Sequence, residues 1–191
     1  MKNQYVADIN DYKKYLLIDD LSHYYESIDV CWMLTPDDKR QDGRKVSYLF
    51  NELKRSDRKI YDCLRNLIIQ GIRNVEAIEQ SGILPIRKYY KQLDDINLED
   101  MPELLFLDPD NGIEVNSTPY GKTGSDRYVY FRDMDKFLDR GSDLLIYQHY
   151  PRVNHETYHQ KKTSEIMDNW AQVQVIHFDR GTIDFILVKQ I

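Results

Sequence analysis

Acidic and amide side chains follow directly after an apolar run in the middle of the chain. Residues 104–107 are consecutively apolar, and Asp108, Asp110, Asn111 and Glu114 come within the next seven positions. An apolar run without alternation is typical of a strand buried on both faces, as in a parallel sheet. Ligands of open α/β sheets bind at the carboxyl ends of such strands. We therefore predict the centre of the functional site here; the alternative is a solvated turn, since Asp-Pro and Asn-Gly are common turn dipeptides.

A histidine follows a second apolar run. Residues 143–147 predict another buried strand, and His149 and Arg152 come just after it. We expect His149 to act as a general acid or base, unless it is a structural histidine. Arg152, together with Lys122 from the polar loop 116–127, is a candidate for binding phosphate, or else forms surface ion pairs.

Three charged residues lie on the first predicted helix. Apolar side chains recur at helical intervals over residues 8–21, with Asp8 or Asn10 as the N-cap. Asp8, Asp11 and Lys14 are candidates for binding a substrate or cofactor; Asp8 and Asp11 could instead simply cap the helix.

A charged loop follows the first predicted strand, which spans residues 28–34. The loop contains Thr35, Asp42, Gly43 and Arg44. If this strand is parallel to the strand at 104–107, both loops emerge at the same edge of the sheet. We therefore count these four residues as further binding candidates.

The remaining pattern alternates helices and strands. We expect one or two helices over 46–69 with a break near 56–57, a short strand near 74–78, a helical turn over 86–93, helices over 131–140 and 158–170, and strands at 173–177 and 183–188 joined by a tight turn. The last two strands should pair antiparallel. The predicted fold class is α/β: a single Rossmann-like domain over residues 1–191, with a mostly parallel sheet that ends in an antiparallel strand pair.

Composition limits the classes of function. The 191 residues carry a formal net charge of −6, which argues against a protein that coats nucleic acid by neutralising its phosphates. Cys31 and Cys63 show no metal-binding spacing and are read as buried thiols of a reducing compartment. Without a signal peptide or an apolar run near 18 residues, the expectation is a cytoplasmic protein with no membrane partner.

The antiparallel ending and the Asp108-Pro109 dipeptide resemble features of class I methyltransferases. Adenine-N6 methyltransferases carry Asp-Pro-Pro-aromatic after their fourth strand, and this chain keeps the first two positions. It also resembles the bacterial ribosomal-RNA adenine-N6 methyltransferases, which have Asp-x-x-Lys-His on a first helix; Asp11 and Lys14 match, and Tyr15 replaces the histidine. The resemblance implies S-adenosylmethionine as cofactor and a nucleotide or nucleic acid as substrate. The cofactor loop departs from the family, because Gly43 is its one glycine.

A second resemblance covers nearly the whole chain. It is similar to a family of bacterial and phage-type proteins that share the 34–38 and 42–44 segments, the Asp108 to Glu114 loop and the 147–152 motif. This resemblance implies no particular activity.

Two other chemistries stay open. Asp108, Asp110 and Glu114 could ligate Mg²⁺ or Mn²⁺ through hard oxygen atoms in a phosphodiesterase or nuclease. The same acids could instead grip a ribose, or activate water at an anomeric carbon, in a metal-free nucleotide-binding or N-glycosidic-bond enzyme. Methyl transfer is our first expectation, on fold analogy. The oligomeric state is not predictable from these patterns.

Overall fold

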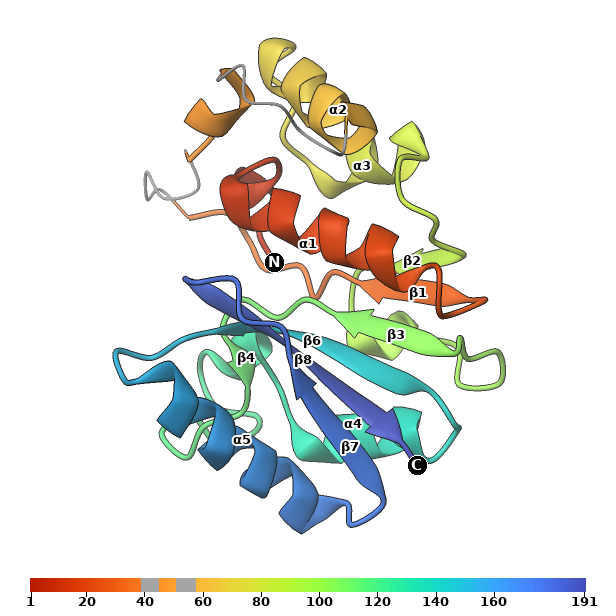
Figure 1. Ribbon diagram of the computed structural model, residues 1–191, viewed down its shortest axis with the longest axis vertical. Helices are drawn as coiled ribbons and strands as arrows, with labels where there is room; N and C mark the ends of the chain where they lie inside the picture. The colour runs from red at the N-terminus through yellow and green to blue at the C-terminus, as the bar shows by residue number, and fades with distance from the viewer. Residues whose placement is uncertain (39–44, 51–57) are drawn as a thin grey trace.

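The computed structural model describes residues 1–38, 45–50 and 58–191. A six-stranded sheet in the order β2-β1-β3-β6-β8-β7 forms the middle layer, with helices on both faces (Figure 1). The strands of this sheet are β1 (Ile28–Cys31), β2 (Lys88–Tyr90), β3 (Leu104–Leu107), β6 (Asp143–His149), β7 (Val173–His177) and β8 (Ile183–Gln190). The α-helices are α1 (Ile9–Leu21), α2 (Arg58–Ile69), α3 (Val75–Ser81), α4 (Phe131–Leu138) and α5 (His155–Asn169).

Four strands run parallel. β1 pairs with β2 on one side and β3 on the other, and β3 pairs with β6. All residues of β1 and β3 are buried, which agrees with the unbroken apolar run of β3. The one charged residue of β1, Asp29, is paired with Arg87 at 2.8 Å. β8 then lies between β6 and β7 and is antiparallel to both. The predicted α/β class and the mostly parallel sheet with an antiparallel ending are confirmed.

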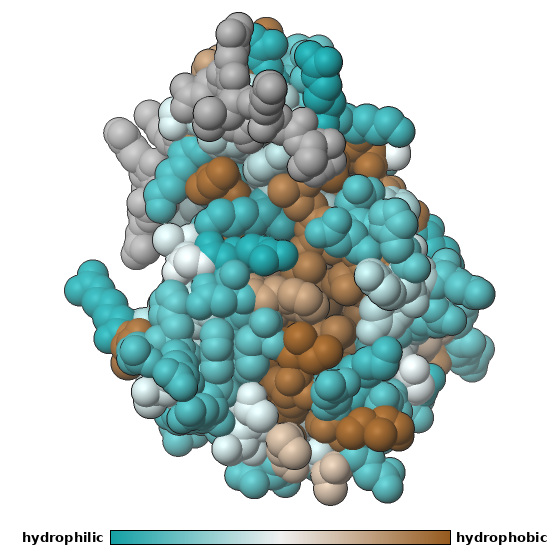
Figure 2. Space-filling model, viewed as in Figure 1, coloured by the Kyte–Doolittle hydropathy of each residue, from teal (hydrophilic) through white to brown (hydrophobic). Residues whose placement is uncertain are grey.

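The two faces of the sheet have separate cores. Helices α1, α2 and α3 pack their apolar side chains on one face, and α4 and α5 cover the other. On the first face, Ile176 of β7 and Phe178 just after it are only half-buried. Figure 2 shows an apolar band over the middle of the molecule, flanked by hydrophilic surface.

Two predictions of local structure are wrong. Residues 74–78 begin a helix rather than a strand: Asn74 caps α3 by accepting a hydrogen bond from the Ala77 N–H at 2.8 Å. Residues 86–93 contain β2 rather than a helical turn, because Lys88–Tyr90 align in parallel with β1. In both segments too few residues repeat for the sequence period to distinguish helix from strand.

Smaller elements complete the chain. Four 3₁₀ helices are described: η1 (Asn3–Tyr5), η2 (Ser47–Phe50), η3 (Leu93–Asp95) and η4 (Ser125–Arg127). A short parallel pair, β4 (Gly112–Ile113) and β5 (Tyr128–Val129), was not predicted. The expected helix break near 56–57 lies outside the described residues. None of the helices in the described ranges has the length and apolar character that crossing a membrane requires.

Candidate active site at the carboxyl ends of β1, β3 and β6

A cavity of about 250 Å³ opens beside the first turns of α1, at the carboxyl ends of the parallel strands. Its walls combine carboxylates, cations and aromatic rings. The lining residues are Met1, Tyr5, Asp8, Asn10, Asp11, Lys14, Lys45, Asp108, Pro109, Asp110, Tyr147 and His149. Five of the predicted site residues, Asp8, Asp11, Lys14, Asp108 and Asp110, are therefore brought together with His149.

A buried lysine joins the helix to the loop after β3. Lys14 Nζ lies 2.6 Å from Asp108 Oδ2 and 2.7 Å from Asp11 Oδ1, and all three side chains are at most 3% exposed. Asp11 also accepts hydrogen bonds from the Tyr15 hydroxyl at 3.0 Å and from the Ala7 N–H at 3.1 Å. The ammonium therefore neutralises two carboxylates that burial would otherwise make unfavourable.

The protonation states of this trio follow from burial and charge. Burial alone would lower the pKa of Lys14, but the charges of Asp108 and Asp11 outweigh it and raise that pKa. Burial raises the pKa of Asp108, against the opposing effect of Lys14. Lys14 is therefore firmly cationic at neutral pH.

Asp110 is held by a second set of cations. Its Oδ1 lies 2.9 Å from the amine of Met1, and its Oδ2 lies 3.0 Å from Lys2 Nζ and accepts a 2.6 Å hydrogen bond from Thr35 Oγ1. Burial would raise the pKa of Asp110, but the amine, Thr35 and Lys2 together lower it to about 2. The predicted meeting of the Thr35 loop and the Asp108 loop is confirmed by this contact.

Asp8 is the acid in the cavity with the most unusual protonation. It is the N-cap of α1 and accepts hydrogen bonds from the N–H groups of Asn10 at 2.8 Å and Asp11 at 3.0 Å. Burial and the nearby charge of Asp11 raise its pKa to about 6, against these hydrogen bonds and Lys14. Asp8 can therefore gain or lose a proton close to neutral pH.

His149 stands at the mouth of the cavity. The residue as a whole is exposed at the end of β6, while its Nε2 lies 3.3 Å from the Tyr147 hydroxyl in a partly buried contact. Desolvation by the surrounding walls lowers the pKa of His149, which favours the neutral imidazole. A neutral imidazole at this position can accept a proton from a bound group.

A glutamine hydrogen-bonds the loop after β3 to the end of β6. Gln148 Oε1 accepts from the Ile113 N–H at 2.9 Å, and its Nε2 donates to the carbonyls of Asn111 at 3.0 Å and His149 at 2.8 Å. Gly112 has φ +117°, and a Cβ there would lie 2.2 Å from Gln148 Oε1. Asn111 thus contributes its backbone to the loop and is not part of the cavity wall.

Three predicted site residues lie away from the cavity. Glu114 accepts a 3.3 Å hydrogen bond from the Phe131 N–H at the start of α4, while Lys122 and Arg152 are exposed and do not line the cavity. Asp42, Gly43 and Arg44 lie outside the described residues.

The loop acids do not fit a metal site in this geometry. Lys14 Nζ occupies the position between Asp108 and Asp11 that a divalent ion would take. Within the described residues, Asp108, Asp110 and Glu114 do not bring their carboxylates together around one point.

No protein-family model matches the chain, and the search of curated proteins finds no match. The cavity therefore has to be interpreted from its own chemistry.

Sequence reasoning missed part of the cavity wall. Tyr147 could have been found, because alternate residues of a strand share one face and Tyr147 precedes His149 by two positions. Asn10 was considered only as an N-cap, and Tyr5 and Lys45 carried no comparable signal, since they lie in a short 3₁₀ helix and in a loop. The ion pairs of Asp110 with the amine of Met1 and with Lys2 join parts of the chain over 100 residues apart.

Proposed function

We propose that this protein is a nucleotide- or nucleic-acid-directed enzyme of the S-adenosylmethionine-dependent methyltransferase type. The carrying observation is the position of the Asp108-Pro109 dipeptide. It follows β3 and lines a cavity at the carboxyl ends of the parallel strands. Adenine-N6 methyltransferases, which the sequence resembles, carry their Asp-Pro dipeptide after the corresponding strand. The antiparallel insertion of β8 between β6 and β7 supports the same fold analogy.

The chemistry of the cavity suits an uncharged or weakly charged organic group. Asp11, Asp108 and Asp110 are already paired with Lys14, Lys2 and the amine of Met1, so these three need no added cation. Tyr5 and Tyr147 offer aromatic surface against which a base can pack. The volume of about 250 Å³ lies below the roughly 300–1,000 Å³ of ordinary ligand pockets, which suits one base or one sugar.

Only part of the cofactor would fit in this cavity. Carboxylates suit the ribose hydroxyls of S-adenosylmethionine, and Asp8 and Asp11 are the acids closest to the helix N-terminus. When bound, the cofactor supplies an electrophilic methyl group. The chain's own contribution would be to orient the acceptor base and to take up the proton that the acceptor amine loses. Asp8 and His149 are the groups whose pKa values suit that transfer.

The raised pKa of Asp8 also favours a second candidate. An acid with a pKa of about 6 can protonate a departing base, as a metal-free enzyme acting on an N-glycosidic bond requires. The metal-dependent phosphodiesterase is less well supported, because Lys14 fills the space between the acids.

Isothermal titration calorimetry with S-adenosylmethionine tests the first candidate. We expect binding in the micromolar range and a loss of at least about tenfold in affinity, or about 1.4 kcal/mol, for Asn10→Ala and His149→Ala. His23→Ala is the matched control, because His23 is exposed beyond the far end of α1. Binding of adenosine or ribose 5-phosphate, but not of the cofactor, would support the second candidate. Binding of Mg²⁺ or Mn²⁺ alone, lost in Asp110→Asn, would contradict both.

A further inference from the structure

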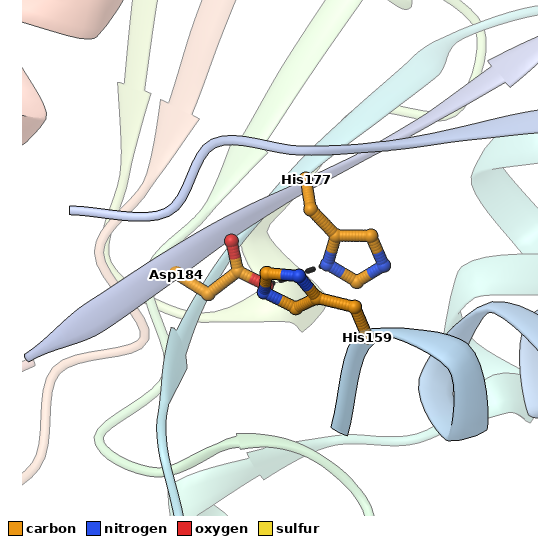
Figure 3. A group of neighbouring side chains, drawn as sticks. All are labelled: His159, His177 and Asp184. Atoms are coloured by element: carbon orange, nitrogen blue, oxygen red, sulfur yellow. Dashed lines mark hydrogen bonds and ion pairs between the residues drawn. The ribbon is translucent and has the colours of Figure 1, made fainter. Parts of the chain in front are cut away.

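Two histidines and an aspartate meet on the other face of the sheet, away from the cavity. His159 comes from α5, His177 from the end of β7 and Asp184 from β8, and their side chains point toward one another (Figure 3). One potential ligand atom of each residue lies within 4.8 Å of the others. In the described part of the chain, no other group of three or more histidine, cysteine or acidic side chains converges in this way.

The three residues converge on one carboxylate oxygen. Asp184 Oδ2 lies 2.6 Å from His177 Nδ1 and 3.4 Å from His159 Nε2. A zinc ion bound at about 2.0–2.2 Å to nitrogen and oxygen needs its ligand atoms a little over 3 Å apart. The 3.4 Å spacing meets this requirement, whereas the 2.6 Å spacing is that of a hydrogen bond and would have to lengthen on metal binding. Because the two imidazole rings stack at 4.2 Å with 25° between their planes, each must rotate to aim its lone pair at a shared ion.

The buried charge of Asp184 favours binding of a cation by the cluster. The side chain of Asp184 is 0% exposed, and its Oδ1 has no hydrogen-bond partner among the described residues. The basic groups that the described residues place within ion-pair distance of it are His159 and His177 alone. A buried carboxylate without a permanent cation is unfavourable, and a divalent ion would relieve that.

Neighbouring side chains are placed to orient both imidazoles. Thr163 Oγ1 lies 3.0 Å from His177 Nε2, and Nδ1 of the same ring is hydrogen-bonded to Asp184 Oδ2 at 2.6 Å. Metal binding would displace the proton from Nδ1, and Nε2 could then donate to the hydroxyl while Nδ1 binds the ion. The Tyr150 hydroxyl is hydrogen-bonded to His159 Nε2 at 2.6 Å. Metal binding would replace that hydrogen bond.

We propose that His159, His177 and Asp184 form a binding site for one divalent transition-metal ion of the zinc class. Two imidazoles and one carboxylate suit such borderline ions and do not suit Mg²⁺ or Ca²⁺, which take oxygen ligands. His159 is 23% exposed, so an ion can enter from its side and keep a further position open to water. Three protein ligands with an open position are the arrangement of catalytic zinc sites. The proposal is independent of the function assigned to the cavity, because the two sites lie on opposite faces of the sheet.

Metal titration of the full chain tests the site. Isothermal titration calorimetry with Zn²⁺ near pH 7.5 should give a stoichiometry of one ion per chain. Mg²⁺ should not bind to these three residues. His177→Ala and Asp184→Asn should each lower the Zn²⁺ affinity by at least about tenfold. His159→Ala provides the same test at a partly exposed position if the buried variants do not fold.

A neighbouring histidine supplies the matched control. His155 lies one turn before His159 on α5, stacks on Tyr150 at 3.7 Å and contacts Asp179, but it does not join the three ligands. His155→Ala should keep the stoichiometry and affinity of the unmodified chain. Absence of Zn²⁺ binding to the folded protein would overturn the proposal. So would Zn²⁺ binding that His159→Ala and His177→Ala leave unchanged.

Discussion

A single buried lysine neutralises two of the acids in the candidate active site. Lys14 contacts Asp108 and Asp11 in the wall of the cavity, where all three side chains are almost fully buried. The attraction within such a trio contributes little net stability, because it offsets the cost of burying the charges. Removing one partner is strongly destabilising, because it leaves a buried charge unpaired. At the residue scale, the cavity therefore depends on the pairing of Lys14 with its two carboxylates.

Replacing this lysine should strongly destabilise the fold. Lys14→Met leaves Asp108 and Asp11 buried without their cation, and we expect the free energy of unfolding to fall by about 3–5 kcal/mol. Urea denaturation measures the change. The control is Lys161→Met, since Lys161 is exposed and its pairing with Glu165 at 3.7 Å contributes at most about 0.5 kcal/mol. Equal losses in the two variants would contradict the proposed role of Lys14.

The protonation of Asp8 should appear in the pH dependence of stability. Its pKa rises from 3.8 to about 6 on folding, so the folded state binds more protons than the unfolded state between these values. Stability is therefore lost as pH rises through this window. Asp8→Asn keeps an N-cap oxygen but cannot ionise. We expect its free energy of unfolding, relative to the unmodified chain, to rise by up to about 3 kcal/mol from pH 4 to pH 7.

Urea denaturation at a series of pH values measures this difference. A difference between Asp8→Asn and the unmodified chain that stays constant from pH 4 to pH 7 would show that Asp8 keeps an ordinary pKa. In that case Asp8 would lose its candidacy as the proton-transfer group of the cavity.

At the scale of elements, the loop after β3 and the end of β6 act as one unit. Gln148 holds the backbone at Asn111 and Ile113, and this contact requires that position 112 carries no side chain. The connection fixes Asp108 and His149 on the same side of the cavity. It also places two polar motifs of the sequence, the Asp108 to Glu114 loop and the 147–152 motif, next to each other.

Gly112→Ala tests this connection. The new Cβ would meet Gln148 Oε1 at 2.2 Å in a backbone conformation of φ +117°, so we expect a loss of about 3 kcal/mol or more in the free energy of unfolding. Gly121→Ala is the matched control, because Gly121 also has positive φ (+74°) but open space around it. The control should lose only about 1 kcal/mol. A similar loss for both variants would mean that Gln148 can move aside without cost.

At the scale of the whole molecule, segments with a long period or an unbroken apolar run were predictable, and short segments with neither were not. The unbroken apolar runs of β3 and β6 and the paired runs of β7 and β8 gave their type and direction correctly. β2 was missed because three residues, with two tyrosines, carry no period. Helix α3 was misread because Val75 and Ile78 are its two buried apolar side chains.

The parts of the site whose position depends on strand direction could be predicted from the sequence. Parallel β1, β3 and β6 bring the Thr35 loop, Asp108 and His149 to one edge, as the strand pattern indicated. Glu114 was misplaced because Gly112 turns the chain into β4, and the Glu114 N–H then pairs with the Val129 carbonyl. The meeting of His159, His177 and Asp184 depends on how α5 packs against the two end strands. No spacing along the chain encodes that packing.

An NMR titration with S-adenosylmethionine tests the central claim, that the cavity beside α1 is a nucleoside-binding active site. Amide spectra of ¹⁵N-labelled protein should change at the first turn of α1, in the Asp108 to Asn111 loop and at His149, with saturation at micromolar to low millimolar cofactor. His149→Ala should weaken these changes while His23→Ala leaves them intact. A lack of any change at saturating concentrations, or changes confined to α5 and β7, would contradict the account.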